Sequence, residues 1–334
     1  MTHVQPAQYT KTRKIMSINN LSRREFLKKC RDMSALVFGS TIFTNEIAEG
    51  FVKLSAAERP QVIFIQSQCC TGCSISTTYG NETDFIDFIT NIIRLQVHPN
   101  ISFSQGVDYM ALIDEVANSG PFYLVCEGSI PAGMKEACIF NDVPMYDYMH
   151  TLMNKAAAIV SSGTCACSGG IPASNQNVTG AIPMDEYMKR TGVDKPMVKI
   201  PGCPINPDRL MGTVAYIVAT GKLPELVDGK PKQYYGDLIH NQCGRYQAFN
   251  QGHYTTSFDK EKNNCLLKNG CRGPVVFSDC PTRRWNGKVN VCIESNTPCI
   301  GCIHDDFPFN SPLYLSEESF EDTSWSEMKE KMKK

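Results

Sequence analysis

The 334-residue sequence has neither a large excess of one charge nor a long apolar run. Its 33 Lys and Arg nearly balance its 34 Asp and Glu, and no basic stripe is interleaved with aromatic residues. Nucleic-acid binding needs such a positive footprint, so we set that class of function aside. A membrane-spanning helix needs about 20 consecutive apolar residues, and the sequence contains no such stretch. We therefore expect no nucleic-acid partner and no membrane span in this chain.

Cysteine, in contrast, is abundant. A chain of this length can form two domains with their own apolar cores, and it does not need disulfides for stability. The sixteen cysteines are more than packing alone would use. We expect most of them to be metal ligands or disulfide partners.

Seven of the cysteines lie between residues 240 and 302, and His240 stands three residues before the first of them; these eight side chains are enough for two metal centres. Zinc sites favour compact Cys-x2-Cys pairs, and a disulfide framework needs no histidine. The irregular spacing here favours iron–sulfur clusters, in which histidine can replace part of the thiolate ligand set. Zinc and disulfides remain the alternatives. The eight residues are His240, Cys243, Cys265, Cys271, Cys280, Cys292, Cys299 and Cys302.

The N-terminal segment has the features of an export signal. Its run Ser22-Arg23-Arg24-Glu25-Phe26-Leu27-Lys28-Lys29 is typical of the twin-arginine route, and a short apolar stretch follows at residues 33–43. We predict that residues 1–57 are a signal peptide, the alternative being a basic amphipathic helix that stays on the protein. The twin-arginine route carries folded proteins, so thiols that had already bound iron in the cytoplasm could not form disulfides after export.

Short apolar runs alternate with helical periodicity between residues 61 and 219. Such alternation predicts a parallel sheet with helices on both of its faces. Strands are predicted at residues 61–66, 121–126, 156–160 and 197–200, and helices at residues 83–95, 146–154 and 208–219.

Four cysteines follow directly after three of these predicted strands. Cys70 and Cys73 come after the first strand, Cys165 after residues 156–160, and Cys203 after residues 197–200. Ligands of open parallel sheets bind beyond the carboxyl ends of the strands. The three strand ends should therefore bring four thiolates to one edge of the sheet.

A family resemblance follows from these motifs and their order. The chain resembles the small, electron-transferring subunit of nickel–iron hydrogenases from about residue 61 to about residue 314. A segment from Glu127 to Pro131 also resembles a family segment near the interface between subunits. The motifs are Cys70-Thr71-Gly72-Cys73, Gly163-Thr164-Cys165-Ala166 and Pro201-Gly202-Cys203-Pro204.

The resemblance implies three iron–sulfur clusters. It places a proximal four-iron cluster on the four cysteines at the strand ends. A distal four-iron cluster would lie on one histidine and three cysteines, and a medial cluster on the remaining cysteines. The proximal ligands would be Cys70, Cys73, Cys165 and Cys203; the distal ligands His240, Cys243, Cys265 and Cys271; the medial ligands Cys280, Cys292, Cys299 and Cys302.

Cys292 decides the type of the medial cluster. Many relatives have proline at this position and a three-iron medial cluster. A fourth thiolate allows a four-iron cluster of lower potential, as in the nickel–iron–selenium branch of the family. If Cys292 only packs, the medial cluster has three irons.

The other cysteines are expected not to bind iron. Oxygen-tolerant relatives carry extra cysteines where this chain has Gly72 and Gly170, so the resemblance implies an ordinary proximal cluster and sensitivity to oxygen. Cys69 and Cys167 stand beside ligands without matching the motif, although Cys69 could compete with Cys70. The remaining three are Cys126 in a strand and Cys138 in a helix, both expected to be small buried apolar residues, and Cys30, expected to leave with the signal.

These expectations define the organisation of the chain. It should contain a signal at residues 1–57, a flavodoxin-like domain with the proximal cluster at 58–206, an irregular iron–sulfur domain at 207–315 and a polar tail at 316–334. Clusters would form much of the core of the irregular domain, where apolar periodicity is weak.

The resemblance also implies the function. A large subunit would split H2 at a nickel–iron site, and electrons would pass through this chain to a cytochrome or another redox partner in the periplasm. Association with a membrane would then depend on a partner. The alternatives are a stand-alone carrier like a polyferredoxin and the cluster subunit of a quinone-reducing complex, which lacks the second region.

Overall fold

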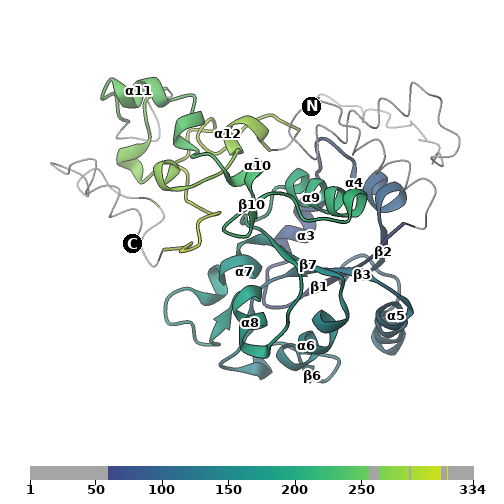
Figure 1. Ribbon diagram of the computed structural model, residues 1–334. Coiled ribbons are helices and arrows are strands. Elements are labelled where there is room, and N and C mark those ends of the chain that lie inside the picture. The colour runs from purple at the N-terminus through teal and green to yellow at the C-terminus, as the bar shows by residue number, and fades with distance from the viewer. Residues whose placement is uncertain (1–58, 256–262, 286, 310–313, 315–334) are drawn as a thin grey trace, which may run out of the picture.

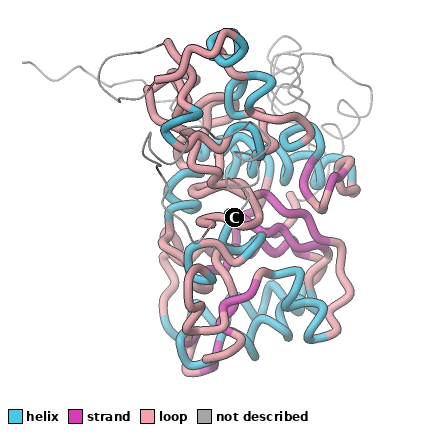
Figure 2. Tube along the Cα trace, turned by 90° about the vertical axis from the view of Figure 1, so that its left-hand side faces the viewer, coloured by secondary structure: helices cyan, strands magenta, loops and turns pink. Residues whose placement is uncertain are grey.

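The computed structural model describes residues 59–255, 263–285, 287–309 and 314. Strands flanked by helices form one part of the molecule, and short helices and loops form a second part beside it (Figure 1). A view turned by 90° shows that the second part consists mainly of loops and short helices (Figure 2). The predicted signal at residues 1–57 and the polar tail at 316–334 lie outside the described residues.

The central sheet has five parallel strands in the order β2-β1-β3-β7-β9. Counted along the chain within this sheet, the order is 2-1-3-4-5, which is the flavodoxin-like arrangement. The predicted α/β fold is therefore confirmed. The strands are β1 (Gln61–Gln66), β2 (Arg94–Val97), β3 (Phe122–Glu127), β7 (Ala158–Ser162) and β9 (Met197–Ile200).

Helices cover both faces of the sheet because its strands bury side chains on alternate sides. Val62 and Phe64 of β1 pack into one core, and Ile63 and Ile65 pack into the other. The first face is covered by α3 (Gly72–Thr77), α4 (Phe85–Asp87), η2 (Phe88–Ile92) and α9 (Pro207–Thr220). The second face is covered by α5 (Gly106–Ser119), α6 (Met145–Lys155) and α8 (Met184–Thr191).

Short elements complete the α/β part. Helix α7 begins directly after β7, and small antiparallel pairs form between β4 and β8 and between β5 and β6. These elements are α7 (Gly163–Ser168), η3 (Lys135–Ala137), η4 (Ile171–Ala173), β4 (Ile130–Pro131), β5 (Ile139–Phe140), β6 (Val143–Pro144) and β8 (Ala181–Ile182).

The second region shares its core with the first face of the sheet. Leu266 and Val276 belong to the same buried cluster as Leu210 and Val214 of α9. Four of its cysteines are buried in this cluster, so thiols form part of the core. Its elements are β10 (Leu226–Val227), β11 (Lys230–Pro231), α10 (Lys232–Tyr235), η5 (His240–Gln242), α11 (Tyr246–Asn250), η6 (Leu267–Asn269), η7 (Gly273–Val275) and α12 (Cys280–Arg283).

Two sequence predictions need correction. The helix predicted at residues 83–95 ends at Ile92 as a π-helix, and strand β2 begins at Arg94. Leu95 pairs with Val62 of β1, so a tertiary contact overrides the local helical pattern. Cys138 does not lie in a helix: it follows η3 in extended conformation and is only half-buried.

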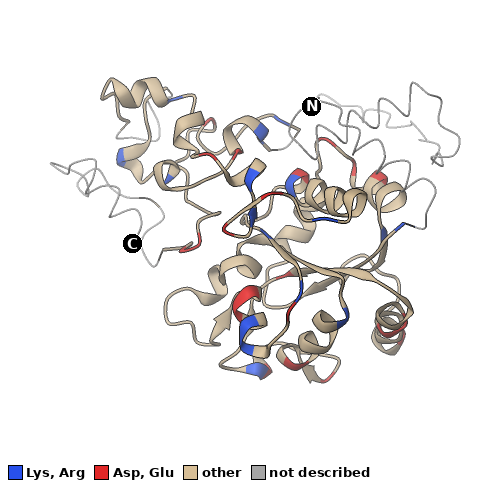
Figure 3. Ribbon diagram, viewed as in Figure 1, with Lys and Arg blue, Asp and Glu red and all other residues tan. Residues whose placement is uncertain are grey.

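Positive and negative side chains are interspersed along the ribbon (Figure 3). Helix α8 has Asp185 and Glu186 in its first turn and Lys189 and Arg190 in its last turn, an order that favours the helix dipole. Within the described residues, no helix has both the length and the apolar character needed to cross a membrane.

Candidate functional site

The loop after β1 carries the first two predicted proximal ligands. Thr71 adopts a left-handed conformation (φ 67°), and helix α3 begins at Gly72. A Cβ atom at Gly72 would lie 3.1 Å from the Cys70 Sγ atom. The backbone of α3 therefore passes close to the first thiol, which is exposed, whereas Cys73 is buried.

The ends of β7 and β9 meet this loop. Gly163 follows β7 with a positive φ of 86°, and a Cβ atom there would lie only 2.4 Å from the Cys73 Sγ atom. The Thr164 N–H donates to the Gly202 carbonyl at 2.9 Å, and the Gly202 N–H donates to Thr164 Oγ1 at 2.9 Å. These two bonds hold the turn before Cys165 against the turn before Cys203.

The four proximal thiols influence one another electrostatically. Burial, with smaller contributions from Cys203 and Cys70, raises the pKa of Cys165 to about 12. Burial also raises the pKa of Cys73 well above its ordinary value, with added contributions from Cys165 and Cys203. Thiolates at this edge thus need a nearby positive charge, and iron ions would supply it. The strand ends bring together all four residues predicted from the sequence.

Glu127 contributes to this edge in a way that the sequence does not reveal. It is the last residue of β3 and is 2% exposed. Its carboxylate accepts hydrogen bonds from the Cys73 N–H at 3.1 Å and the Ser74 N–H at 3.2 Å, and Gln66 Nε2 donates to it at 3.2 Å. Glu127 therefore fixes the first turn of α3 relative to β1 and β3.

The predicted distal ligands line one small pocket. His240 and Cys243 come from η5 and the residue after it, while Cys265 and Cys271 flank η6. The His240 ring packs edge-on against Phe249, with 4.5 Å between ring centroids. Burial raises the pKa of Cys265 to about 12 and that of Cys271 to about 11. One imidazole and three thiols around a pocket match the donor set of an iron–sulfur cluster.

The predicted medial ligands also influence one another. Burial, with a contribution from Cys280 and a smaller one from Cys292, raises the pKa of Cys302 to about 12. Burial raises the pKa of Cys299 well above its ordinary value, and Cys302 and Cys280 contribute. Cys292 is the exposed member of the group; partial burial of its sulfur and the nearby Cys280 raise its pKa.

The medial group adjoins both other groups. On the proximal side, a backbone hydrogen bond from Cys203 lowers the pKa of Cys302, against the larger effect of burial. Thr164 Oγ1 also donates to the Cys302 carbonyl at 2.5 Å. On the distal side, Cys271 acts electrostatically on Cys299, and the Arg272 N–H donates to the Cys299 carbonyl at 2.7 Å. The three groups therefore form a series with the medial group in the middle.

Of the described cysteines predicted not to bind iron, three contact groups other than the predicted ligands, and the fourth, Cys69, lies near the proximal group. Cys126 is buried in β3, with its sulfur 4.0 Å from the Met149 sulfur. Cys167 is buried and donates to the Ser161 carbonyl at 3.4 Å. Cys138 accepts from Ser67 Oγ at 3.8 Å. Cys69 is half-buried near the proximal group, and burial followed by the charge of Glu127 raises its pKa to about 12.

Every cysteine within the described residues is free. In the same part of the chain, no three His, Cys, Asp or Glu side chains converge on a position for a single metal ion. An iron–sulfur cluster takes one ligand on each iron, so its ligands need not meet at one point.

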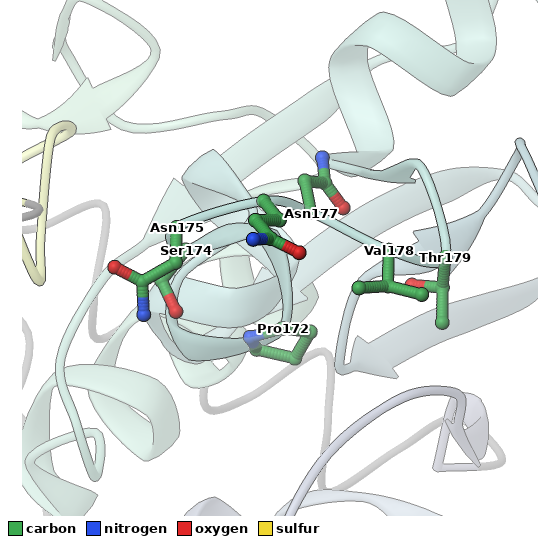
Figure 4. A pocket seen from close by; sticks show the side chains of 7 residues that line it. Pro172, Ser174, Asn175, Asn177, Val178 and Thr179 are labelled. Carbon is green, nitrogen blue, oxygen red and sulfur yellow. The ribbon is translucent and has the colours of Figure 1, made fainter.

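A separate open pocket lies in the loop between η4 and β8 (Figure 4). It is lined by Pro172 and residues 174–179, and it contains none of the predicted ligands. The exposed Val178 stands on this loop, and the exposed Ile171 lies at the start of η4.

The fold and the linked thiol groups define an electron-transfer subunit of the α/β class, and comparison with known proteins identifies its family. A model that describes the C-terminal part of the NiFe/NiFeSe hydrogenase small subunit matches residues 235–314. A model described as NADH ubiquinone oxidoreductase, 20 Kd subunit, matches residues 70–217.

The relatives and solved structures agree with this result. The periplasmic NiFeSe hydrogenase small subunit of Desulfomicrobium baculatum is 34% identical over 319 residues, which cover 89% of this chain and 100% of the relative. A periplasmic NiFe hydrogenase small subunit of Nitratidesulfovibrio vulgaris is 33% identical, and the match covers 89% of this chain and 94% of the relative. A crystal structure of the reduced, active D. baculatum Ni-Fe-Se hydrogenase matches with a TM-score of 0.74 and 34% identity, covering 78% of this chain and 100% of that one.

The chain belongs to the family of nickel–iron hydrogenase small subunits. It is the electron-relay subunit of an oxidoreductase that acts on H2, and members of its family carry iron–sulfur clusters.

Replacing Gly163 should disrupt the proximal group. In Gly163→Ala the new methyl group would collide with the Cys73 sulfur, so we expect a loss of up to about four irons per chain. Gly192→Ala is the matched control because its φ of 74° is also positive but no atom lies within 4 Å of the added Cβ. Iron analysis of both purified variants tests this; equal iron contents would show that Gly163 does not limit the site.

Proposed function

We propose that this small subunit holds three four-iron clusters and conducts electrons between a nickel–iron large subunit and an external redox partner. The observation that carries the proposal is the series of three linked ligand groups, with the medial cysteines next to both the proximal and the distal ones. The clusters would supply one-electron oxidation and reduction. The protein would hold the ligands in place, exclude water from the clusters and arrange the three clusters in a series.

Each group has the donors that its cluster requires. Buried thiols with raised pKa values stay protonated without a cation, and binding to cationic iron would release the proton and stabilise the thiolate form. The proximal ligands are Cys70, Cys73, Cys165 and Cys203; the distal ligands are His240, Cys243, Cys265 and Cys271; the medial ligands are Cys280, Cys292, Cys299 and Cys302.

The proximal edge is the proposed docking face for the large subunit. Cys70 is exposed, and an apolar groove beside Gly72 is lined by Ile75, Tyr79 and Trp285. Ile75 and Tyr79 of α3 are 57% and 65% exposed. Exposed apolar side chains next to a redox site favour burial by a partner.

The distal end would face the electron acceptor or donor. His240 is partly exposed, and its ring packs against Phe249 of α11. Helix α11 lies away from the central sheet (Figure 1). A cytochrome or another redox protein could therefore approach this end while the proximal edge is covered by the large subunit.

We place the protein in the periplasm, as the names of its relatives in D. baculatum and N. vulgaris indicate for those proteins. The twin-arginine motif within residues 1–57 supports export in the folded state. The proposed domains are 58–206 and 207–315, with a polar tail at 316–334. Helix α9 lies at the start of the second of these ranges but packs on the sheet of the first, so we count it with the sheet region.

The alternative functions have less support. The hypothesis of a stand-alone polyferredoxin-like carrier does not explain why the chain is similar to a hydrogenase small subunit over the full length of that subunit. A cluster subunit of a quinone-reducing complex would account for residues 70–217 but not for the match at residues 235–314.

Replacing Cys292 tests the type of the medial cluster. Cys292→Pro should remove one thiolate and leave a three-iron medial cluster of higher potential, with a loss of about one iron per chain. Electron paramagnetic resonance of the oxidised protein should then show a new three-iron signal. Cys138→Ser, which replaces a cysteine outside the three groups, should leave the spectrum unchanged. An unchanged spectrum in Cys292→Pro would refute its ligand role.

Replacing both arginines of the signal tests the export route. Arg23→Lys with Arg24→Lys keeps the charge but removes the twin-arginine motif, so we expect the subunit to accumulate in the cytoplasm. The control, Lys28→Arg with Lys29→Arg, should leave export intact. Immunoblots of periplasmic and cytoplasmic fractions measure the outcome. Normal export of the double-lysine variant would exclude the twin-arginine route.

A further inference from the structure

A fully buried arginine lies beside the proposed medial site. Arg209 is the third residue of α9 and is 0% exposed. Its Nη2 atom lies 3.2 Å from the Cys280 Sγ atom, 2.7 Å from Ser278 Oγ and 2.7 Å from Asp279 Oδ1. Helix α9 of the sheet region therefore places a cation directly on a predicted cluster ligand of the second region.

The Cys280 sulfur has a second polar neighbour. Ser278 is fully buried, and its Oγ lies 3.2 Å from the Cys280 Sγ atom. Because the Ser278 oxygen accepts a hydrogen bond from Arg209, its own hydroxyl hydrogen can be donated to the sulfur. The arrangement thus directs an N–H group and an O–H group at the same ligand atom.

The positive charge of Arg209 is only partly balanced. Asp279 accepts from Arg209 Nε and Nη2 through Oδ1, and it accepts from Arg283 Nε through Oδ2 at 2.7 Å. One carboxylate therefore serves two guanidinium groups. The nearby Asp208 carboxylate is bonded instead to the backbone N–H groups of Asn81 and Glu82.

Burial of a charge in this way is costly unless an opposite charge compensates for it. The Arg209 Nη1 atom is buried and has no hydrogen-bond partner among the described residues. The fully buried Tyr235 ring lies 5.2 Å from the guanidinium carbon and helps to exclude water. The negative charge that suits this environment is that of thiolates bound to a cluster.

We propose that Arg209 is a positioning residue that raises the reduction potential of the medial site. This inference rests on the proposed medial cluster. Reduction adds negative charge to a cluster, and a buried cation with an N–H group on the ligand sulfur stabilises the reduced form. The fourth thiolate, Cys292, is expected to lower the potential of the medial cluster, and Arg209 offsets part of that effect. The medial cluster can then still accept electrons from one neighbouring cluster and pass them to the other.

The test is a redox titration of the purified complex of large and small subunits, followed by electron paramagnetic resonance. The medial signal is the one that changes in Cys292→Pro. In Arg209→Met, which keeps an unbranched side chain but removes the charge and the donors, the ratio of reduced to oxidised medial cluster at a fixed potential should fall at least about tenfold. For a one-electron couple this corresponds to a downward shift of about 59 mV.

Arg283→Met is the matched control. Arg283 binds the same carboxylate and has a side chain that is 7% exposed, but no hydrogen bond joins it to Cys280. Its replacement should change the ratio of reduced to oxidised medial cluster by less than about threefold. On a logarithmic scale, this is under half of the shift expected for Arg209→Met. A shift in Arg283→Met as large as that in Arg209→Met would overturn the specific role of Arg209.

A second variant covers the case in which Arg209→Met fails to load iron. Asp279→Asn removes the carboxylate and leaves Arg209 in place, so the medial potential should rise. An unchanged or lower potential in Asp279→Asn, or an unchanged potential in iron-loaded Arg209→Met, overturns the inference. If the wild-type complex itself shows no medial cluster signal, the proposed function fails instead.

Discussion

Parallel pairing of β1, β3, β7 and β9 brings the carboxyl ends of four strands to one edge of the sheet, and the proposed proximal site depends on this constraint. Three of these ends are followed by the proximal cysteines, and the fourth ends in Glu127, which holds the turn at Cys73. The edge is crowded enough that Gly163 has no room for a side chain. Fold and ligand geometry are thus set by the same backbone.

The second region is organised differently. It has short helices and few strands, and its buried residues include Cys265, Cys271, Cys280 and Cys299. Neighbouring thiols in a buried environment resist ionisation, as the raised pKa values show. Binding to iron removes this penalty, so cluster assembly should contribute to the folding free energy of this region. Folding with clusters in place would suit export in the folded state.

Sequence reasoning predicted most of the sheet because its strands are short apolar runs with clear boundaries. Strands β1 and β9 have the predicted limits, and β3 and β7 are displaced by one or two residues. The strand around Leu95 was missed because its position depends on pairing with β1 rather than on its local pattern. The sequence also fails to predict the extended conformation of Cys138, whose carbonyl accepts a hydrogen bond from the Met145 N–H at 2.8 Å.

The proposed ligand groups rest on sequence motifs, whereas the polar contacts around them could not be predicted from the sequence. No local pattern links Arg209 to Asp279, because 70 residues separate them and only the packing of α9 against the second region brings them together. The segment from Glu127 to Pro131 resembles a family segment, but the sequence gives no sign of the bonds from Cys73 and Ser74 to the Glu127 carboxylate, which appear only in three dimensions. Long-range polar contacts of this kind have no signature in a single sequence.

The central claim is that this chain is a three-cluster electron relay attached to a nickel–iron subunit. The most direct measurement is metal analysis of the native complex, purified without oxygen through a tag on this chain and separated into its subunits. The account predicts a nickel-containing partner and a brown small subunit with about twelve irons. A colourless small subunit that purifies without nickel and without iron would contradict it.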